Sequence, residues 1–251
     1  MTTNRISAGG LAFLLLTSVG WGLNWPITKY VLAQCPPMSA RGWSGVAGGL
    51  ALALYALAVG TSLKVPRDQW FRLCVSAFLN VSLWMAVMGY ALVFLPASEA
   101  TVIAYTMPVW TALLAWPLLG ERMTVTRVIA LALAFAGLIA LLGGNEMSAS
   151  LAKLPGVVLA LGGAVGFALG TILLKKWPLQ LPGATSAAWQ IFIGCVPVAL
   201  AGLMFEAPQL SALNAGGWAA MAYMTFAQFS LPFMGVVVRT AGGPEAGARS
   251  V

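Results

Sequence analysis

Long apolar segments separated by short polar interruptions fill almost the whole chain of 251 residues. A hydrocarbon core of roughly 30 Å needs about 20 apolar helical residues, and about eight segments of this kind recur. They cover residues 8–32, 40–62, 70–94, 97–119, 125–143, 155–174, 186–206 and 215–238. The apolar runs lack the alternation of barrel strands, so we predict an all-α integral membrane protein, a polytopic helical bundle.

A weak internal repeat relates the two halves of the chain. The segment Leu11–Lys29 recurs about 146 residues later as residues 157–175, and Trp43 then falls opposite Trp189. Duplicated hydrophobic halves are typical of secondary transporters. A repeat unit of five spans, an odd number, must insert its second copy upside down, so we expect an inverted repeat.

The repeat divides the chain into unequal parts. We predict a five-helix repeat over 8–143, an incomplete three-helix repeat over 155–238, and a tail over 239–251 that cannot cross a membrane. In the first copy, the segment that corresponds to this tail is the fourth span, which begins near Ala97. A ninth helix should therefore begin where the tail lies. We therefore expect truncation or a change of reading frame here, while a natural flexible tail on an eight-helix protein stays open.

The basic residues are distributed unequally between the two sides of the predicted bundle. With loops assigned alternately, one side holds ten of the thirteen Lys and Arg residues, and the other holds Lys29, Arg41 and Lys153. Loops rich in Lys and Arg stay in the cytoplasm, so both termini are predicted to be cytoplasmic in a cell (inner) membrane. The loop after the second span carries three basic residues and its repeat counterpart none, which agrees with inversion.

Composition removes several other classes of protein. Apolar residues make up 60% and charged residues 8% of the chain, and the mean hydropathy is +0.90. In soluble domains, charged residues make up roughly a quarter of the sequence. Histidine is absent, which excludes imidazole-based triads and nearly all catalytic zinc sites. The net charge is +7, but the longest run of basic residues is the pair Lys175-Lys176. We therefore expect no nucleic-acid partner.

Three motifs at the end of the first half form a pattern together. They are LPASEA at 95–100, MPVW at 107–110 and LGERMT at 119–124. This pattern resembles the drug/metabolite transporter superfamily, EamA type. The resemblance implies ten helices in two inverted repeats around a central cavity, so spans nine and ten would be missing here. It also implies alternating access and export of small metabolites, amino acids or drugs.

Polar and aromatic residues inside the spans are candidates for a substrate cavity. An unpaired amide costs roughly 1–3 kcal/mol to bury, and Pro26 leaves the Gly22 carbonyl without its usual helical donor. The candidates are Asn24, Trp21, Asn80, Trp84, Tyr105, Trp110 and Gln228. A satisfied kink at Asn24, helix-to-helix hydrogen bonds of the other amides and plain aromatic packing are the structural alternatives.

Arg41 and Glu99 are the charge and coupling candidates, both near the outer ends of spans. They could form a pair. Arg41 could instead face a cavity and hold a carboxylate or phosphate, and Glu99 could exchange a proton. Arg41 snorkelling to the interface stays open as well.

Small residues at helical spacing predict close helix crossings. These helix-packing candidates are Gly162, Gly166 and Gly170 in the sixth span, and Gly45 and Gly49 in the second.

The favoured function is a secondary transporter, because no GxxxxGK[ST] phosphate loop occurs. We expect the lipid bilayer and a small-molecule substrate as partners, and no cofactor or metal. A homo-oligomer stays open. The alternative is a truncated, non-transporting module or remnant that needs a partner. An intramembrane enzyme is disfavoured, since no catalytic cluster is visible at membrane depth.

Overall fold

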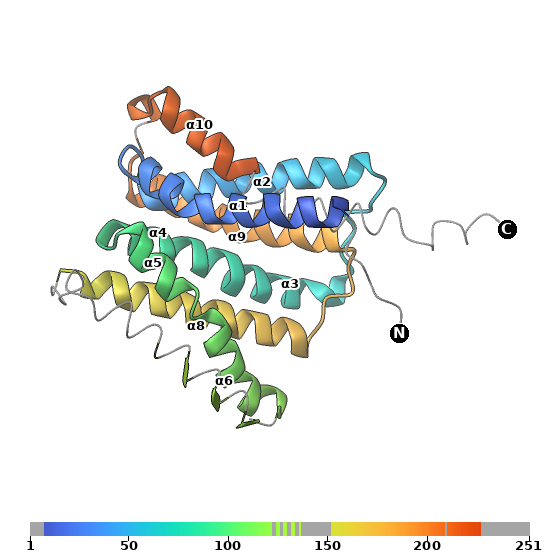
Figure 1. Ribbon diagram of the computed structural model, residues 1–251. Helices are drawn as coiled ribbons and strands as arrows, with labels where there is room; N and C mark the ends of the chain where they lie inside the picture. Colours follow the sequence, from blue (N-terminus) through green and yellow to red (C-terminus); the bar gives the residue numbers. More distant parts are fainter. Residues whose placement is uncertain are drawn as a thin grey trace.

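The computed structural model describes residues 8–121, 152–208 and 210–226, together with isolated positions between 124 and 136. All regular structure in these parts of the chain is helical (Figure 1). The α-helices are α1 (Ala8–Leu32), α2 (Pro37–Ala58), α3 (Trp70–Ala77), α4 (Trp84–Phe94), α5 (Ala97–Ala104), α6 (Met107–Leu119), α8 (Leu154–Lys176), α9 (Gly183–Phe205) and α10 (Ala215–Tyr223). Short 3-10 turns cover Arg67–Gln69 and Leu210–Ala212, and Phe78–Leu83 forms a π-helix.

The observed helix bounds follow the predicted spans closely. α1 occupies 8–32, α5 and α6 together occupy 97–119, and α8 begins and ends within two residues of the predicted 155–174. The predicted span 125–143 lies outside the described residues except for isolated positions, and so does the tail 239–251. The arrangement of five spans plus three therefore stays a prediction.

Four helical segments of the described chain are long and apolar enough to cross a membrane. They are Arg67–Phe94, Ala97–Leu119, Leu154–Lys176 and Gly183–Phe205. Large apolar side chains, such as Leu54 and Phe205, are exposed on the outer surfaces of the helices. In water such a surface would promote aggregation, whereas lipid solvates it. The chain is therefore a helical, multi-pass membrane protein.

Two of these four segments are interrupted within the bilayer. In Arg67–Phe94 the α-helix widens into the π-helix at Phe78–Leu83. In Ala97–Leu119 it breaks at Tyr105–Thr106, just before Pro108, which cannot donate a helical hydrogen bond. π-helical turns occur frequently at functional sites, so the first interruption marks a region of interest.

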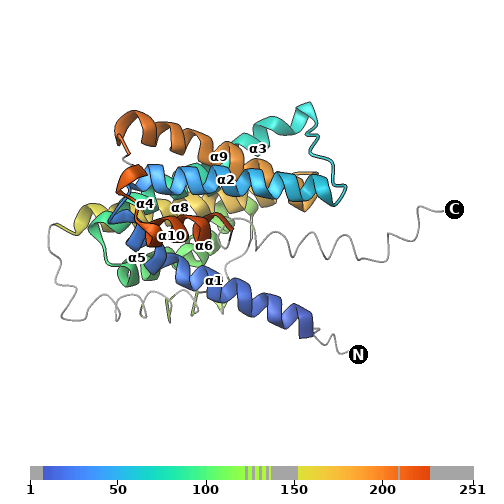
Figure 2. The ribbon, with the colours of Figure 1, turned by 90° about the horizontal axis from the view of Figure 1, so that it is seen from above.

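The pair α2 and α9 forms the most extensive helix contact among the described elements. The two helices lie side by side and antiparallel (Figures 1 and 2). A methyl group on Gly42 would come within 2.5 Å of the Ala199 backbone, and one on Gly49 within 2.9 Å of the Phe192 nitrogen. The helices approach so closely because glycine leaves their backbones uncovered.

Glycines on α8 form a second close contact, with α4 and the π-helix. A methyl group on Gly163 would meet Val87 at 2.7 Å, and one on Gly166 would meet Leu83 at 2.5 Å. Gly170 faces Asn80. By contrast, Gly162 has open space around it and lies off this face, and Gly45 is buried in α2. The contact face of α8 therefore contains Gly163, Gly166 and Gly170, with Gly163 in place of the predicted Gly162.

Two loop contacts at different places in the bundle correspond through the repeat. The backbone nitrogen of Asn214, before α10, donates to the Gln34 side chain after α1, at 3.0 Å. The backbone nitrogen of Gln180, after α8, donates to the Gln69 side chain before α3, at 2.8 Å. Gln34 and Gln180 stand 146 positions apart, at the offset of the predicted repeat, although Gln34 uses its side chain and Gln180 its backbone nitrogen; the repeat itself stays a prediction.

We predict that Gly42→Ala lowers the thermal unfolding midpoint in detergent, because its methyl group would meet helix backbone and force α2 and α9 apart. The matched control is Gly162→Ala, which adds the same methyl group in open space. Alanine is favoured over glycine in a helix by about 0.5–1 kcal/mol, so the control should equal or exceed the wild type. Equal midpoints for both variants would contradict the packing interpretation.

Candidate substrate site

The π-helix presents a buried amide that lacks one hydrogen-bond partner. Asn80 Nδ2 donates to Ser76 Oγ at 3.2 Å. Its Oδ1 is buried without any partner and faces Gly170 of α8. An orphan amide oxygen in an apolar interior is costly, about 1–3 kcal/mol, which makes Asn80 a candidate for contact with a ligand N–H if α8 moves away.

A chain of polar side chains continues from Asn80 to α9. Ser76 Oγ donates to Gln190 Oε1 at 2.6 Å, and Gln190 Nε2 donates to Ser186 Oγ at 2.8 Å. Nearby, Ser82 Oγ donates to the Gly194 carbonyl at 2.7 Å. Sequence reasoning missed Ser76 and Gln190, although polar residues inside apolar spans were the signal that could have found them.

The aromatic candidates lie in different environments. Trp84, one turn after Asn80, packs against Phe167 of α8 with ring centroids 5.3 Å apart. The Trp110 indole donates to Thr106 Oγ1 at 3.1 Å. Trp21 and Tyr105 are 52% and 57% exposed, so neither is packed inside the bundle. Asn80 and Trp84 thus face α8 together, whereas the side chains of Trp21 and Tyr105 are largely uncovered and their place in a cavity stays a prediction.

Asn24 is buried within an unbroken α1. The helix continues through Pro26, and Thr28 Oγ1 donates to Asn24 Oδ1 at 3.2 Å. This contact satisfies one acceptor of the amide within its own helix, whereas the structural alternative was a kink satisfied by a neighbouring helix. Gln228 lies outside the described residues. The roles of both amides in a cavity stay predictions.

Arg41 is buried near the N-terminus of α2, with 2% of its surface exposed. Its Nη2 donates to the Met85 sulfur at 3.2 Å, while Nε and Nη1 have no hydrogen-bond partner. The guanidinium therefore does not snorkel to the interface. The pair that the sequence suggested between Arg41 and Glu99 is also replaced, because Glu99 binds Lys153.

The segment α5–α6 packs against α8, and an ion pair joins the two at each end of their contact. Lys153 Nζ lies 2.8 Å from Glu99 Oε1, and Lys175 pairs with Glu121. Both pairs join residues 54 positions apart, so the helices run parallel and in register. A helix as long as α8 rises about 1.5 Å per residue, which places the two pairs near opposite faces of the bilayer.

Glu206 links three helices at the end of the bundle where α2 begins and α9 ends. Its carboxylate accepts hydrogen bonds from the backbone nitrogens of Met38 and Ser39, from Ser39 Oγ and from the Tyr90 hydroxyl, at 2.8–3.0 Å. The N-terminus of a helix attracts a negative charge, so Glu206 caps α2. In the loop before α2, burial and the Glu206 charge raise the pKa of the Cys35 thiol, which stays protonated at neutral pH.

Lys29 has an analogous role at the end of α4. Its Nζ donates to the carbonyl oxygens of Leu92 and, at 3.0 Å, Leu95. Cations stabilise the C-terminus of a helix. Sequence reasoning assigned functions to neither Lys29 nor Glu206, because a capping partner distant in the chain leaves no local pattern.

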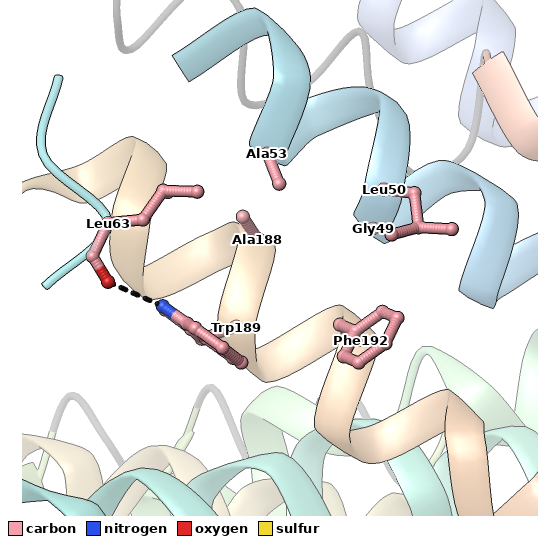
Figure 3. Close-up of a pocket in the computed structure, with 7 residues that line it drawn as sticks. All are labelled: Gly49, Leu50, Ala53, Leu63, Ala188, Trp189 and Phe192. Atoms are coloured by element: carbon pink, nitrogen blue, oxygen red, sulfur yellow. Dashed lines mark hydrogen bonds between the residues drawn. The ribbon is translucent and has the colours of Figure 1, made fainter. Parts of the chain in front are cut away.

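A cavity of about 200 Å³ lies between α2 and α9, away from the polar candidates (Figure 3). It is lined by Gly49, Leu50, Ala53, Leu63, Ala188, Trp189 and Phe192. The Trp189 indole is already bonded to the Leu63 carbonyl at 2.9 Å. Its lining is apolar, so it lacks the convergent polar groups of a metabolite site. Across the described residues, no cluster of acidic and sulfur ligands could hold a metal ion.

Buried polar groups between glycine-packed, lipid-exposed helices are typical of membrane transport proteins. Comparison with known proteins agrees with this class. Residues 8–143 match the EamA-like transporter family, and the chain belongs to this family.

Several known proteins are similar to part of this chain. The chain is 36% identical to the uncharacterized transporter YvbV of Bacillus subtilis (strain 168), over 78% of this chain and 62% of the relative. It is 21% identical to the uncharacterized transporter YoaV of the same organism, over 74% and 64%. Protein PecM of Dickeya dadantii (strain 3937) is 26% identical, over 69% and 56%. The chain thus spans about three fifths of these relatives' lengths.

A solved structure described as the crystal structure of a protein shares the fold. It superposes with a TM-score of 0.67 over 90% of this chain and 77% of that chain, at 20% sequence identity. At this identity the likeness shows the fold alone.

We predict that Glu206→Gln destabilises the protein by about 1–3 kcal/mol, because hydrogen bonds to a charged group contribute more than neutral ones. The measurement is the unfolding midpoint in detergent at neutral pH. Glu121→Gln is the control, since it breaks an ion pair whose lysine is 64% exposed, and exposed pairs contribute about 0–1 kcal/mol. A smaller loss for Glu206→Gln than for the control would refute the capping role.

Proposed function

We propose that the chain is a multi-pass secondary transporter of the drug/metabolite type. It would export small metabolites or amino acids across the inner membrane, with both termini in the cytoplasm. Membership of the EamA-like transporter family supports this class. The observation that carries the mechanism is the pair of ionic contacts that join α5–α6 to α8 near opposite membrane faces.

Alternating access requires a closure on each side that opens at low cost. α5–α6 comes from the first predicted repeat and α8 from the second, so relative motion of the repeats would separate one ion pair at a time. The Lys175–Glu121 pair, with side chains 64% and 27% exposed, resembles the surface pairs that contribute about 0–1 kcal/mol. The Lys153–Glu99 pair is more buried, at 27% and 16%, so its separation requires water to enter at that end. In both pairs the opposite charges favour re-closure.

The substrate in this proposal contacts the surface between the two ion pairs. Asn80 offers a free amide oxygen there, and Trp84 offers an aromatic wall with Phe167. Asn24, Trp110 and Gln228 remain proposed lining residues. Glu99 remains a proposed coupling residue. Its carboxylate could take up a proton when it separates from Lys153, and release the proton when the pair forms again.

Transport by this chain is tested in proteoliposomes loaded with radiolabelled amino acids, one at a time. We expect efflux above that of protein-free liposomes for at least one compound. Asn80→Ala should lower its initial rate by about tenfold or more, as expected for the loss of a buried hydrogen bond. Thr171→Ala is the control, because this exposed hydroxyl bonds only to the Phe167 carbonyl of its own helix turn.

The same experiment separates the alternative function. A non-transporting module would give no efflux of amino acids or other metabolites, although the protein reconstitutes and unfolds cooperatively. Full activity of Asn80→Ala would instead contradict the proposed position of the substrate.

The ion pairs are tested by reversible crosslinking. In a Cys74→Ser background, which removes the exposed thiol, Glu99→Cys with Lys153→Cys is treated with a bifunctional methanethiosulfonate. We expect transport to stop and to return when a reductant removes the crosslink. Glu121→Cys with Lys175→Cys should behave in the same way. The four single-cysteine proteins, Glu99→Cys included, should still release the loaded substrate after treatment, because efflux down its own gradient does not require the proposed coupling carboxylate. Unchanged transport by either crosslinked protein would exclude movement at that end.

A further inference from the structure

The least satisfied charge in the described structure is the guanidinium of Arg41. It is almost fully buried, and most of its N–H donors have no acceptor. The contact that it does make goes to the thioether of Met85, which is a weak acceptor. An unpaired buried charge costs several kcal/mol, so the site is complete only when an anion is present.

The nearby carboxylates are engaged elsewhere. Glu99 pairs with Lys153, and Glu206 is saturated by the α2 N-terminus, Ser39 and Tyr90. The protein therefore supplies no counter-ion to Arg41 within the described residues.

Local packing holds the Arg41 side chain in place on one side, and a flexible side chain forms the other. Gly89 of α4 lies against the Arg41 side chain, and a methyl group at this position would come within 3.1 Å of Arg41 Cδ. The flexible Met85 side chain is the part of the wall that can move, because an unbranched thioether adopts several conformations at low cost. A small group could thus replace the sulfur contact.

We propose that Arg41 binds the carboxylate of the transported small molecule. This inference rests on the proposed transport function and adds the chemical class of the substrate. The planar fork of guanidinium donors matches a carboxylate, and one positive charge neutralises one negative charge. A phosphate dianion would need a second cation, whereas Lys29 is bound to the carbonyl oxygens at the end of α4.

The test measures ligand-induced thermal stabilisation of the purified chain in detergent. The probes are the amino acids and benzoate, the matching amides in which an uncharged carboxamide replaces the carboxylate, and inorganic phosphate. Wild-type protein should be stabilised by carboxylates and not by the matching amides or by phosphate. Arg41→Met should fold, because an apolar side chain replaces an unpaired buried charge. It should bind the same carboxylates about tenfold or more weakly.

Three further variants make the test specific. Arg72→Met removes a positive charge from an exposed position and should keep the wild-type response. Arg41→Lys keeps the charge without the fork and should respond between wild type and Arg41→Met. Gly89→Ala should weaken carboxylate binding while Arg41 is intact, because it displaces the guanidinium.

Equal stabilisation by amides, stronger stabilisation by phosphate, or an unchanged response of Arg41→Met would each overturn the assignment. Failure of the transport function looks different. In that case carboxylates bind through Arg41, but wild-type proteoliposomes move no compound. Arg41→Met that transports like wild type, with Asn80→Ala inactive, would leave transport standing and reject the carboxylate site.

Discussion

The structure depends on backbone contact between helices that have no hydrophobic reason to associate. Lipid tails are as apolar as the side chains they surround, so packing and polar contacts must hold the bundle together. Gly42 and Gly49 meet that requirement for α2 and α9, and Gly163 and Gly166 do so for α8 and α4. Since α2 and α9 come from different predicted repeats, their contact also joins the two halves of the chain.

The bilayer also determines where polar groups are tolerated. At the ends of the bundle they are satisfied: Glu206 caps α2, Lys29 caps α4, and two ion pairs close the edges of α8. By contrast, Asn80 Oδ1 and most of the Arg41 guanidinium are buried without partners. A stable bundle would gain free energy by replacing both with apolar residues. The proposed ligand accounts for these two groups better than stability does.

The sequence alone predicted the spans well and the side-chain contacts poorly, for a physical reason. Membrane thickness fixes the length of an apolar helix, so the bounds of α1, α5–α6 and α8 followed from hydropathy. Rotation of a helix about its axis is set by its neighbours. For that reason Gly163 faces α4 where Gly162 was expected, and Tyr105 is largely uncovered.

The sequence could not predict contacts between residues far apart in the chain. It predicts that Glu99 and Arg41 lie at a similar level of the membrane. Only the parallel packing of α5–α6 on α8 brings Glu99 next to Lys153. The π-helix at Phe78–Leu83 carries no proline or glycine that would reveal it. It forms where α3 and α4 must pack against both α8 and α9, so its cause is tertiary.

The two kinds of helix contact suggest how motion would be divided in the proposed transporter. The α2–α9 contact is backbone against backbone, and separating it would open a void that no side chain can fill. The α5–α6 contact with α8 ends in charges that water or lipid headgroups can solvate, so separating it costs less. Movement of the halves would then leave α2–α9 together as the axis and open the α8 side at alternate ends. Arg41 lies on α2 and Asn80 beside α8, so a substrate held between them would touch both the fixed and the moving part.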